Sequence, residues 1–187
     1  YNVASPTITG YTADKPTVSG TMPANNVEVT VKYSNNSYWL RVDPNGGTWE
    51  GQTTTQSFGM DYLDTKTIPL PTREGYAFTG WTLNDTGSTM SSLTANNATF
   101  TMGTSDATLT ATWSIRSYNL TIHYVYASNG STAKPDHTET LNYGASYNVT
   151  SPTITGYTVD KPTVSGTMPA QDVVVTVKYT IDSYKLT

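Results

Sequence analysis

The sequence contains no cysteine, and only 13% of its 187 residues are charged. Without cysteine, the chain has no disulfide, no catalytic thiol and no cysteine–zinc site, so each domain must be stabilised by its own core or by its neighbours. Strong helix formers are also scarce, because the chain has only four Glu and seven Lys. We therefore do not expect a helical fold.

A concentrated basic surface is missing as well. The ten Lys and Arg residues are scattered and the net charge is −4, whereas nucleic-acid and anionic-membrane binders need clustered positive charge. We therefore expect no nucleic-acid partner. No apolar run reaches the roughly 18–20 residues of a transmembrane helix, so this part of the chain is not expected to insert into a membrane. No charged-then-apolar signal segment opens the chain, and its first residues look internal to a domain.

Thr and Ser take the place of the charged residues, with 37 and 17 copies, and Tyr is frequent at 14. Thr, Val and Tyr suit the pleated, half-buried surface of a sheet. At 36% hydrophobic residues the chain is too apolar for a disordered linker. The composition therefore predicts a mainly β fold. One short helix around residues 88–96 is the only exception that we predict.

Internal repetition dominates the sequence. Residues 1–33 match residues 147–179 at a shift of 146 positions, and only five of the 33 positions differ. Such close identity is typical of a recent duplication within an array. Residues 101–113 align without a gap to residues 21–33 and 167–179, so the middle of the chain carries a more distant copy of the same unit.

Seams between the units are marked by Ser-Tyr-x-Leu, which occurs at 37–40, 117–120 and 183–186, each time separated by three residues from a closing aromatic residue. This spacing predicts three segments and the start of a fourth. They are the opening segment (residues 1–33), which is the second half of a repeat; the middle segment (37–113); the third segment (117–179), which is a complete repeat of the opening kind; and residues 183–187, which begin a further repeat. The short linkers between them predict an elongated array.

The closing part of each segment alternates between apolar and polar residues, as in a strand with one buried face. This pattern places Val27, Val29, Val31 and Tyr33 on one face of a predicted strand. The same pattern recurs in the other two segments and in the first strand of the third. The inward positions there are Leu109, Ala111 and Trp113; Val173, Val175, Val177 and Tyr179; and Leu120, Ile122, Tyr124 and Tyr126.

Two known families share these motifs. The middle segment, with YWLRVDPNGGTWEG at its start, REGYAFTGW in its middle and TFTMGTSDATLTATW at its end, resembles the internalin-type B repeat (the Listeria–Bacteroides repeat family). The opening and third segments, with SPTITGYT, GTMPA and an alternating strand, resemble the mucin-binding-protein (MucBP) repeat. The resemblance implies small β-grasp-like domains in tandem, in wall-anchored or secreted proteins of Gram-positive bacteria. It supplies no catalytic residues and no cofactor.

No cluster of residues predicts a metal site. His123 lies on the outward face of a predicted strand, and His137 lies in a predicted loop beside Asp136. These two histidines lack the third fixed ligand that zinc requires. The stretch DPNGG at 43–47 predicts a hairpin turn rather than a calcium loop, because it lacks further acidic ligands and a closing bidentate Glu.

Catalysis and covalent cross-linking are also not expected. Asp61 and Asp64 lie close together in sequence, but a solvated surface explains them better than a glycosidase cleft. An intramolecular Lys–Asn isopeptide bond needs a buried Lys, whereas Lys32 and Lys178 lie on outward strand faces. We therefore expect the chain not to be an enzyme.

Aromatic residues remain as candidates for ligand contact. Trp39 alternates out of phase with the inward residues of its strand, and Trp49 follows the predicted turn. Exposed Trp side chains stack on sugar rings or anchor a protein partner. Alternatively, both rings cover a seam or a sheet face. Trp81 and Trp113 are assigned to the core.

Two functions follow from these observations. The first is a spacer that projects a distal binding domain from the bacterial surface, as the stalk of an adhesin. The second is a binding module for host mucin, a glycan or a surface protein, because duplication also multiplies weak sites. In both cases the protein is expected to be extracellular and anchored to the cell wall, with the neighbouring repeats of the same chain as partners.

Overall fold

The computed structural model of the protein describes residues 1–85 and 87–183. These residues form two compact units, the first made of Tyr1–Arg73 and Phe78–Trp113, the second of Glu74–Ala77 and the chain from Ser114 onward. Every regular element in the described ranges is a β-strand, which confirms the expected mainly β fold of small tandem sheets. None of these residues belongs to a helix long and apolar enough to cross a membrane. The predicted start of a further repeat at 183–187 lies, apart from Ser183, outside the described residues.

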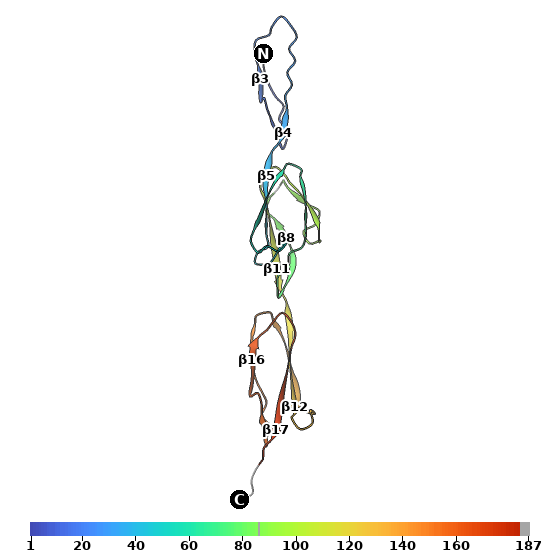
Figure 1. The fold of residues 1–187 in the computed structure, drawn as a ribbon, viewed down its shortest axis with the longest axis vertical. Coiled ribbons are helices and arrows are strands. Elements are labelled where there is room, and N and C mark those ends of the chain that lie inside the picture. The colour runs from blue at the N-terminus through green and yellow to red at the C-terminus, as the bar shows by residue number, and fades with distance from the viewer. Residues whose placement is uncertain (86, 184–187) are drawn as a thin grey trace. The chain divides into compact units, whose positions relative to one another are not determined.

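The third segment shows the complete arrangement of a repeat. Its strands are β12 (Ser117–Tyr126), β13 (Thr132–Asn142), β14 (Ser146–Thr150), β15 (Tyr157–Val159), β16 (Thr163–Thr167) and β17 (Val173–Ile181). The main sheet has the order β13-β12-β17-β15. The strands β12 and β17, which are the first and the last of the segment along the chain, are parallel neighbours at the centre of this sheet (Figure 1). The strands β14 and β16 form a second, two-stranded sheet.

The core of the third segment lies where β12 and β17 meet. Leu120 and Ile122 of β12 are completely buried, and so is Val177 of β17. These are the inward positions that the alternation predicts. Tyr124 and Tyr179 pack beside them with ring centroids 6.4 Å apart. The parallel pairing therefore places the apolar side chains of β12 and β17 side by side on one face of the sheet, and Val164 of β16 and Val149 of β14 belong to the same core cluster.

The middle segment repeats this topology with different residues. Its strands are β5 (Ser37–Asp43), β6 (Gln56–Asp61), β7 (Thr65–Ile68), β8 (Tyr76–Leu83), β9 (Thr89–Met90), β10 (Ala98–Thr101) and β11 (Ala107–Ile115). The main sheet has the order β6-β5-β11-β8, and the first and last strands along the chain, β5 and β11, are again parallel neighbours at its centre. The strands β7, β10 and β9 form a second sheet. Trp81 is buried in its core and Trp113 packs against it, as predicted. The short helix predicted around 88–96 is wrong, because β9 and turns occupy this stretch.

The opening segment has the second half of the same fold without the first. Its strands are β1 (Asn2–Ala4), β2 (Tyr11–Ala13), β3 (Thr17–Ser19) and β4 (Tyr33–Asn35). The pairs β1-β3 and β2-β4 correspond, at the shift of 146 residues, to β14-β16 and to the pairing of β15 with the end of β17. The predicted strand from Val27 to Tyr33 does not form before Tyr33. Among the described residues, no strand pairs with residues 27–32, whereas β12 pairs with the equivalent part of β17, which accounts for the difference.

Candidate binding surfaces

Trp39 is the exposed aromatic residue that the sequence predicts. It lies on the outward face of β5, and 50% of its surface is accessible. Its partner on β6 is Gly59, whose missing side chain leaves the edge of the indole uncovered. The Trp39 backbone N–H donates to Asp106 Oδ1 at 2.9 Å, and Arg41 Nη1 lies 3.1 Å from Asp106 Oδ2. The hydrogen bond from Trp39 and the charge of Arg41 hold the pKa of the exposed Asp106 carboxyl below its usual value.

Trp49 does not lie on the surface, so the prediction that it contacts a ligand is wrong. Only 1% of it is accessible. Its indole N–H donates to the Pro69 carbonyl at 2.9 Å, and its ring packs edge-on against Phe58 with centroids 5.9 Å apart. A tight turn through Glu50 and Gly51, both with positive φ, turns the chain back and carries Trp49 into the core. The sequence position after a hairpin turn did not reveal this burial.

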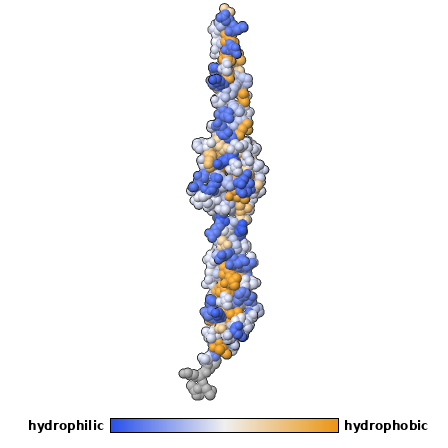
Figure 2. Space-filling view, turned by 45° about the vertical axis from the view of Figure 1, so that its right-hand side comes forward, coloured by the Kyte–Doolittle hydropathy of each residue, from blue (hydrophilic) through white to orange (hydrophobic). Residues whose placement is uncertain are grey.

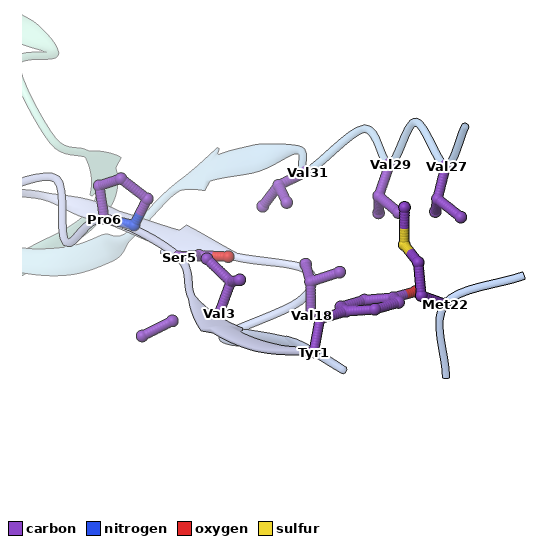
Figure 3. Close-up of a pocket in the computed structure, with 10 residues that line it drawn as sticks. Tyr1, Val3, Ser5, Pro6, Val18, Met22, Val27, Val29 and Val31 are labelled. Carbon is purple, nitrogen blue, oxygen red and sulfur yellow. The ribbon is translucent and has the colours of Figure 1, made fainter. Parts of the chain in front are cut away.

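A groove lies on the opening segment, in which residues 27–32 pair with no strand among the described residues. Its volume is about 380 Å³. The close-up shows that its apolar side chains come from both sides of the segment and point toward a shared space (Figure 3). They include Tyr1, Val18, Met22, Val27, Val29 and Val31. The space-filling view shows apolar surface along this part of the molecule, at the top of the picture (Figure 2).

The same positions are covered in the third segment. Met168, the counterpart of Met22, is 1% accessible, whereas Met22 is 63% accessible. Val177 is completely buried, whereas its counterpart Val31 is only half-buried. Since the two sequences are nearly identical here, the difference in burial comes from the surroundings of these residues, which in the third segment include β12 beside Val177 and the turn at Gly144 and Ala145 beside Met168.

A tyrosine seated on a glycine recurs at two seams. In the first unit, the ring of Tyr62 lies against Gly10, and its centroid is 5.9 Å from that of Tyr11 in an edge-to-face arrangement. A Cβ added to Gly10 would overlap the Tyr62 ring, and Gly10 has a φ of +78°. The Tyr62 N–H donates to Asn36 O at 2.9 Å, and the Asn36 N–H donates to Gly10 O at 2.8 Å.

The second unit contains the same arrangement. The ring of Tyr143 lies against Gly75, which has a φ of +72°, and its centroid is 6.1 Å from that of Tyr76. The Tyr143 N–H donates to Arg116 O, and the Arg116 N–H donates to Gly75 O, each at 2.9 Å. A Gly-Tyr pair, a linker residue and a tyrosine of the next segment therefore form one recurring contact, which we call the glycine seat.

The remaining polar candidates have local structural roles. His123 Nδ1 lies 2.8 Å from Asp136 Oδ2. His137 lies in β13 and not in the predicted loop, and its Nε2 is 3.5 Å from Glu139. No group of three or more His, Asp or Glu side chains that could hold a metal occurs among the described residues.

Carboxylates of the middle segment hold turns together. Asp64 Oδ2 accepts the backbone N–H of Asp61 at 2.9 Å. Partial burial of Asp85 opposes its ionisation, but hydrogen bonds from Ser105, Ser88 and Gly87 outweigh this effect and hold the pKa of its carboxyl well below the usual range. These carboxylates accept backbone or hydroxyl protons, which is what turn-stabilising groups do.

These observations define an all-β tandem-repeat protein in which one sheet topology is used by two kinds of segment. The sequence profile of the MucBP domain matches residues 1–34 and 119–180, which together make up more than half of the chain. The profile of the divergent InlB B-repeat domain matches residues 40–117. The chain therefore belongs to the MucBP domain family and carries a divergent InlB B-repeat domain between its two MucBP stretches, as the motifs predict. Both are non-catalytic repeat domains of surface proteins.

Several solved structures also match. They include the mucin-binding domain of a Streptococcus pneumoniae protein, at 22% identity over 37% of this chain and 93% of that one, with a TM-score of 0.32. The type 2 repeat of the mucus-binding protein MUB from Lactobacillus reuteri is 21% identical over 78% of this chain and 99% of its own length, with a TM-score of 0.32. The family assignment rests on the profiles and not on these loose likenesses. No curated protein matches the sequence.

Proposed function

We propose that this chain is part of the stalk of an adhesin on the surface of a bacterium, where its repeats act as a spacer outside the cell wall to which the protein is anchored. The observation that carries this proposal is the glycine seat. Gly10 and Tyr62 make it in one unit, and Gly75 and Tyr143 make it in the other. The seat is the same although a MucBP stretch comes first in one case and a B-repeat in the other. The same contact joins either kind of repeat, which supports a spacer whose length is set by the number of its repeats.

The acidic and tryptophan side chains of the middle segment also support a role as a spacer, because most of them serve the internal structure of the segment. The acidic groups of the middle segment accept hydrogen bonds from their own backbone and hydroxyl neighbours, as Asp85 does from Ser88 and Ser105. Trp49 and Trp81, two of the four tryptophans, are inside the core. These side chains therefore hold the sheets and turns of each segment in place.

Chains with additional third segments would test the spacer. One, two and three copies of residues 117–182 are appended after Asp182, and the largest dimension of each protein is measured by small-angle X-ray scattering. A spacer requires the same increase for each copy. A dimension that stops growing would show that the repeats collapse onto one another and would overturn the proposal.

A second candidate function is contact with a mucin glycan or a surface protein through Trp39. The half-exposed indole beside Gly59, with the polar Arg41 and Asp106 next to it, combines an apolar face with hydrogen-bonding groups. Sugar rings are recognised by this combination, because their C–H faces stack on aromatic rings while their hydroxyls need polar partners.

Binding of the full chain to immobilised mucin and to a glycan array tests this candidate. Replacing Trp39→Ala is expected to weaken binding by about tenfold, the effect of losing one aromatic anchor. Trp39→Phe serves as the control that keeps an aromatic face. Equal binding by the native chain and by Trp39→Ala would exclude Trp39 as the contact.

A further inference from the structure

The parallel pairing of the first and last strands decides how the middle and third segments respond to tension along the chain. In the third segment the chain enters at the start of β12 and leaves at the end of β17 (Figure 1). Because the two strands run in the same direction, these two points lie at opposite ends of the ladder that joins them. Pulling the points apart therefore slides one strand along the other and strains all the hydrogen bonds between them together. Antiparallel terminal strands would instead be peeled apart one bond at a time.

The ladder of the third segment is long and unbroken. Residues 120–126 of β12 lie opposite residues 173–179 of β17, in seven pairs without a register shift. One face of this ladder is covered by the core, where Leu120, Ile122 and Val177 are completely buried. Sliding the strands must therefore break the backbone hydrogen bonds and the apolar packing at the same time.

A further hydrogen bond closes the ladder at each end, where the tension arrives first. Asp172, which directly precedes β17, accepts the backbone N–H of Asn119 at 2.8 Å, beside the point where the chain enters β12. At the other end, the Ala127 N–H donates to Tyr179 O at 2.9 Å. Both bonds join the first strand, or the residue after it, to the last strand or the residue before it.

The middle segment has the same arrangement with a shorter ladder. Residues 40–43 of β5 lie opposite residues 107–110 of β11, again in parallel. Asp106, which directly precedes β11, accepts the backbone N–H of Trp39 at 2.9 Å. The entry of the first strand is therefore held by an aspartate in both kinds of segment.

Side chains continue the contact at the far end of the shorter ladder. Asn45 Nδ2 donates to Ala111 O at 2.9 Å, and Trp113 Nε1 donates to Pro44 O at 3.1 Å. These two bonds again connect the end of the first strand with the last strand. The middle segment thus uses side-chain hydrogen bonds where the third segment uses backbone pairs.

We propose that the parallel terminal strands are a clamp that keeps each of these two segments folded while the chain carries a pulling force. The clamp rests on the proposed spacer, because tension reaches a segment only through its neighbours in the chain. Resistance to force is governed by the rate of unfolding and not by the equilibrium free energy. Bonds that join the first strand to the last, such as those of Asp106 and Asp172, therefore matter more under tension than equally strong bonds elsewhere.

The direction of pulling tests the clamp in the full chain. The sequence has no cysteine, so two introduced cysteines give unique attachment points for an atomic force microscope or optical tweezers. Ser117→Cys with Ile181→Cys stretches the third segment along the chain direction, whereas Ser117→Cys with Gln171→Cys pulls at one end of the ladder and peels it. All three positions are exposed. We expect the peeled segment to unfold at a several-fold lower force. Equal forces in the two directions would overturn the clamp without affecting the spacer, whose test is the length added by each copy.

Two aspartate variants separate resistance to tension from equilibrium stability. Asp172→Ala removes the bond to β12, whereas Asp160→Ala removes a similar bond, from the Lys178 N–H at 2.7 Å, which joins β17 to the end of β15 instead. Urea unfolding gives the equilibrium cost of each variant. At constant force between Ser117→Cys and Ile181→Cys, we expect Asp172→Ala to raise the unfolding rate about tenfold and Asp160→Ala about twofold or less. The same acceleration by both variants, or none by Asp172→Ala, would contradict the proposal.

Discussion

The glycine seat makes a quantitative prediction, because the second unit offers an occupied and an open copy of the same glycine. Gly75 and Gly156 have φ values of +72° and +81°. A Cβ at Gly75 would overlap the Tyr143 ring, whereas a Cβ at Gly156 would have nothing within 4 Å among the described residues. Replacing either glycine by alanine costs roughly 1–2 kcal/mol, because an L-residue is strained in this backbone conformation. Gly156→Ala is expected to show this cost alone.

Gly75→Ala must in addition move the tyrosine ring. The edge-to-face contact of Tyr143 with Tyr76, with centroids 6.1 Å apart, is then lost. Such a pair contributes roughly 0.5–1.5 kcal/mol beyond its buried area. We therefore expect Gly75→Ala to lower the free energy of unfolding of the second unit by about 1–2 kcal/mol more than Gly156→Ala does, once the lost ring burial is included.

Urea unfolding followed by amide exchange measures both variants on the same unit, and the Tyr143 N–H, which donates to Arg116 O, reports the seat directly. In a Tyr143→Ala background the ring is absent, so Gly75→Ala should then cost no more than Gly156→Ala. This comparison isolates the coupling between glycine and ring. Equal losses for the two glycine variants in the native background would refute the reasoning.

Three further predictions concern burial and charge. Met168→Ala is expected to cost about 2–5 kcal/mol in the urea unfolding of the second unit, whereas Met22→Ala at the equivalent exposed position changes that of the first by less than about 0.5 kcal/mol. Trp49→Ala should lower the unfolding free energy of the first unit by about 3–5 kcal/mol, and Trp39→Ala, on its surface, by less than about 0.5 kcal/mol. The Asp85 carboxyl has a pKa below the unfolded value of about 3.9, so it stabilises the fold fully above about pH 4 and progressively less as the pH falls. The difference in unfolding free energy between the native chain and Asp85→Asn, measured by urea unfolding, should therefore shrink below about pH 4.

Sequence periodicity and duplication predict most of the strands. The inward residues of β12 and β17 follow from alternation, and Leu120, Ile122 and Val177 are all buried. The same pattern fails in the opening segment, where Val27 and Val29 remain accessible. Alternation shows which face a strand would bury but not whether its partner strand is present, and an unpaired stretch forms no ladder hydrogen bonds.

The candidate aromatic residues show a second limit. Trp39 is exposed because it lies out of phase on a strand, and a period of two is visible in sequence. Trp49 lies outside regular alternation, and a turn at Glu50 and Gly51 decides its direction. Glu residues rarely adopt a positive φ, so the residue type at position 50 does not predict the turn that points the indole inward. The glycine seats were likewise visible only as Gly-Tyr pairs, because the tyrosine that fills each one belongs to a different segment.

The two halves of each glycine seat are carried by different segments of the sequence. The middle segment brings a tyrosine at Tyr62 and a glycine at Gly75, and the third brings Tyr143 and Gly156. A duplication or deletion of one whole segment therefore regenerates a matched pair at the new joint, whichever kind of repeat it brings together. A gene for such a chain can lengthen or shorten by unequal recombination without needing a compensating substitution.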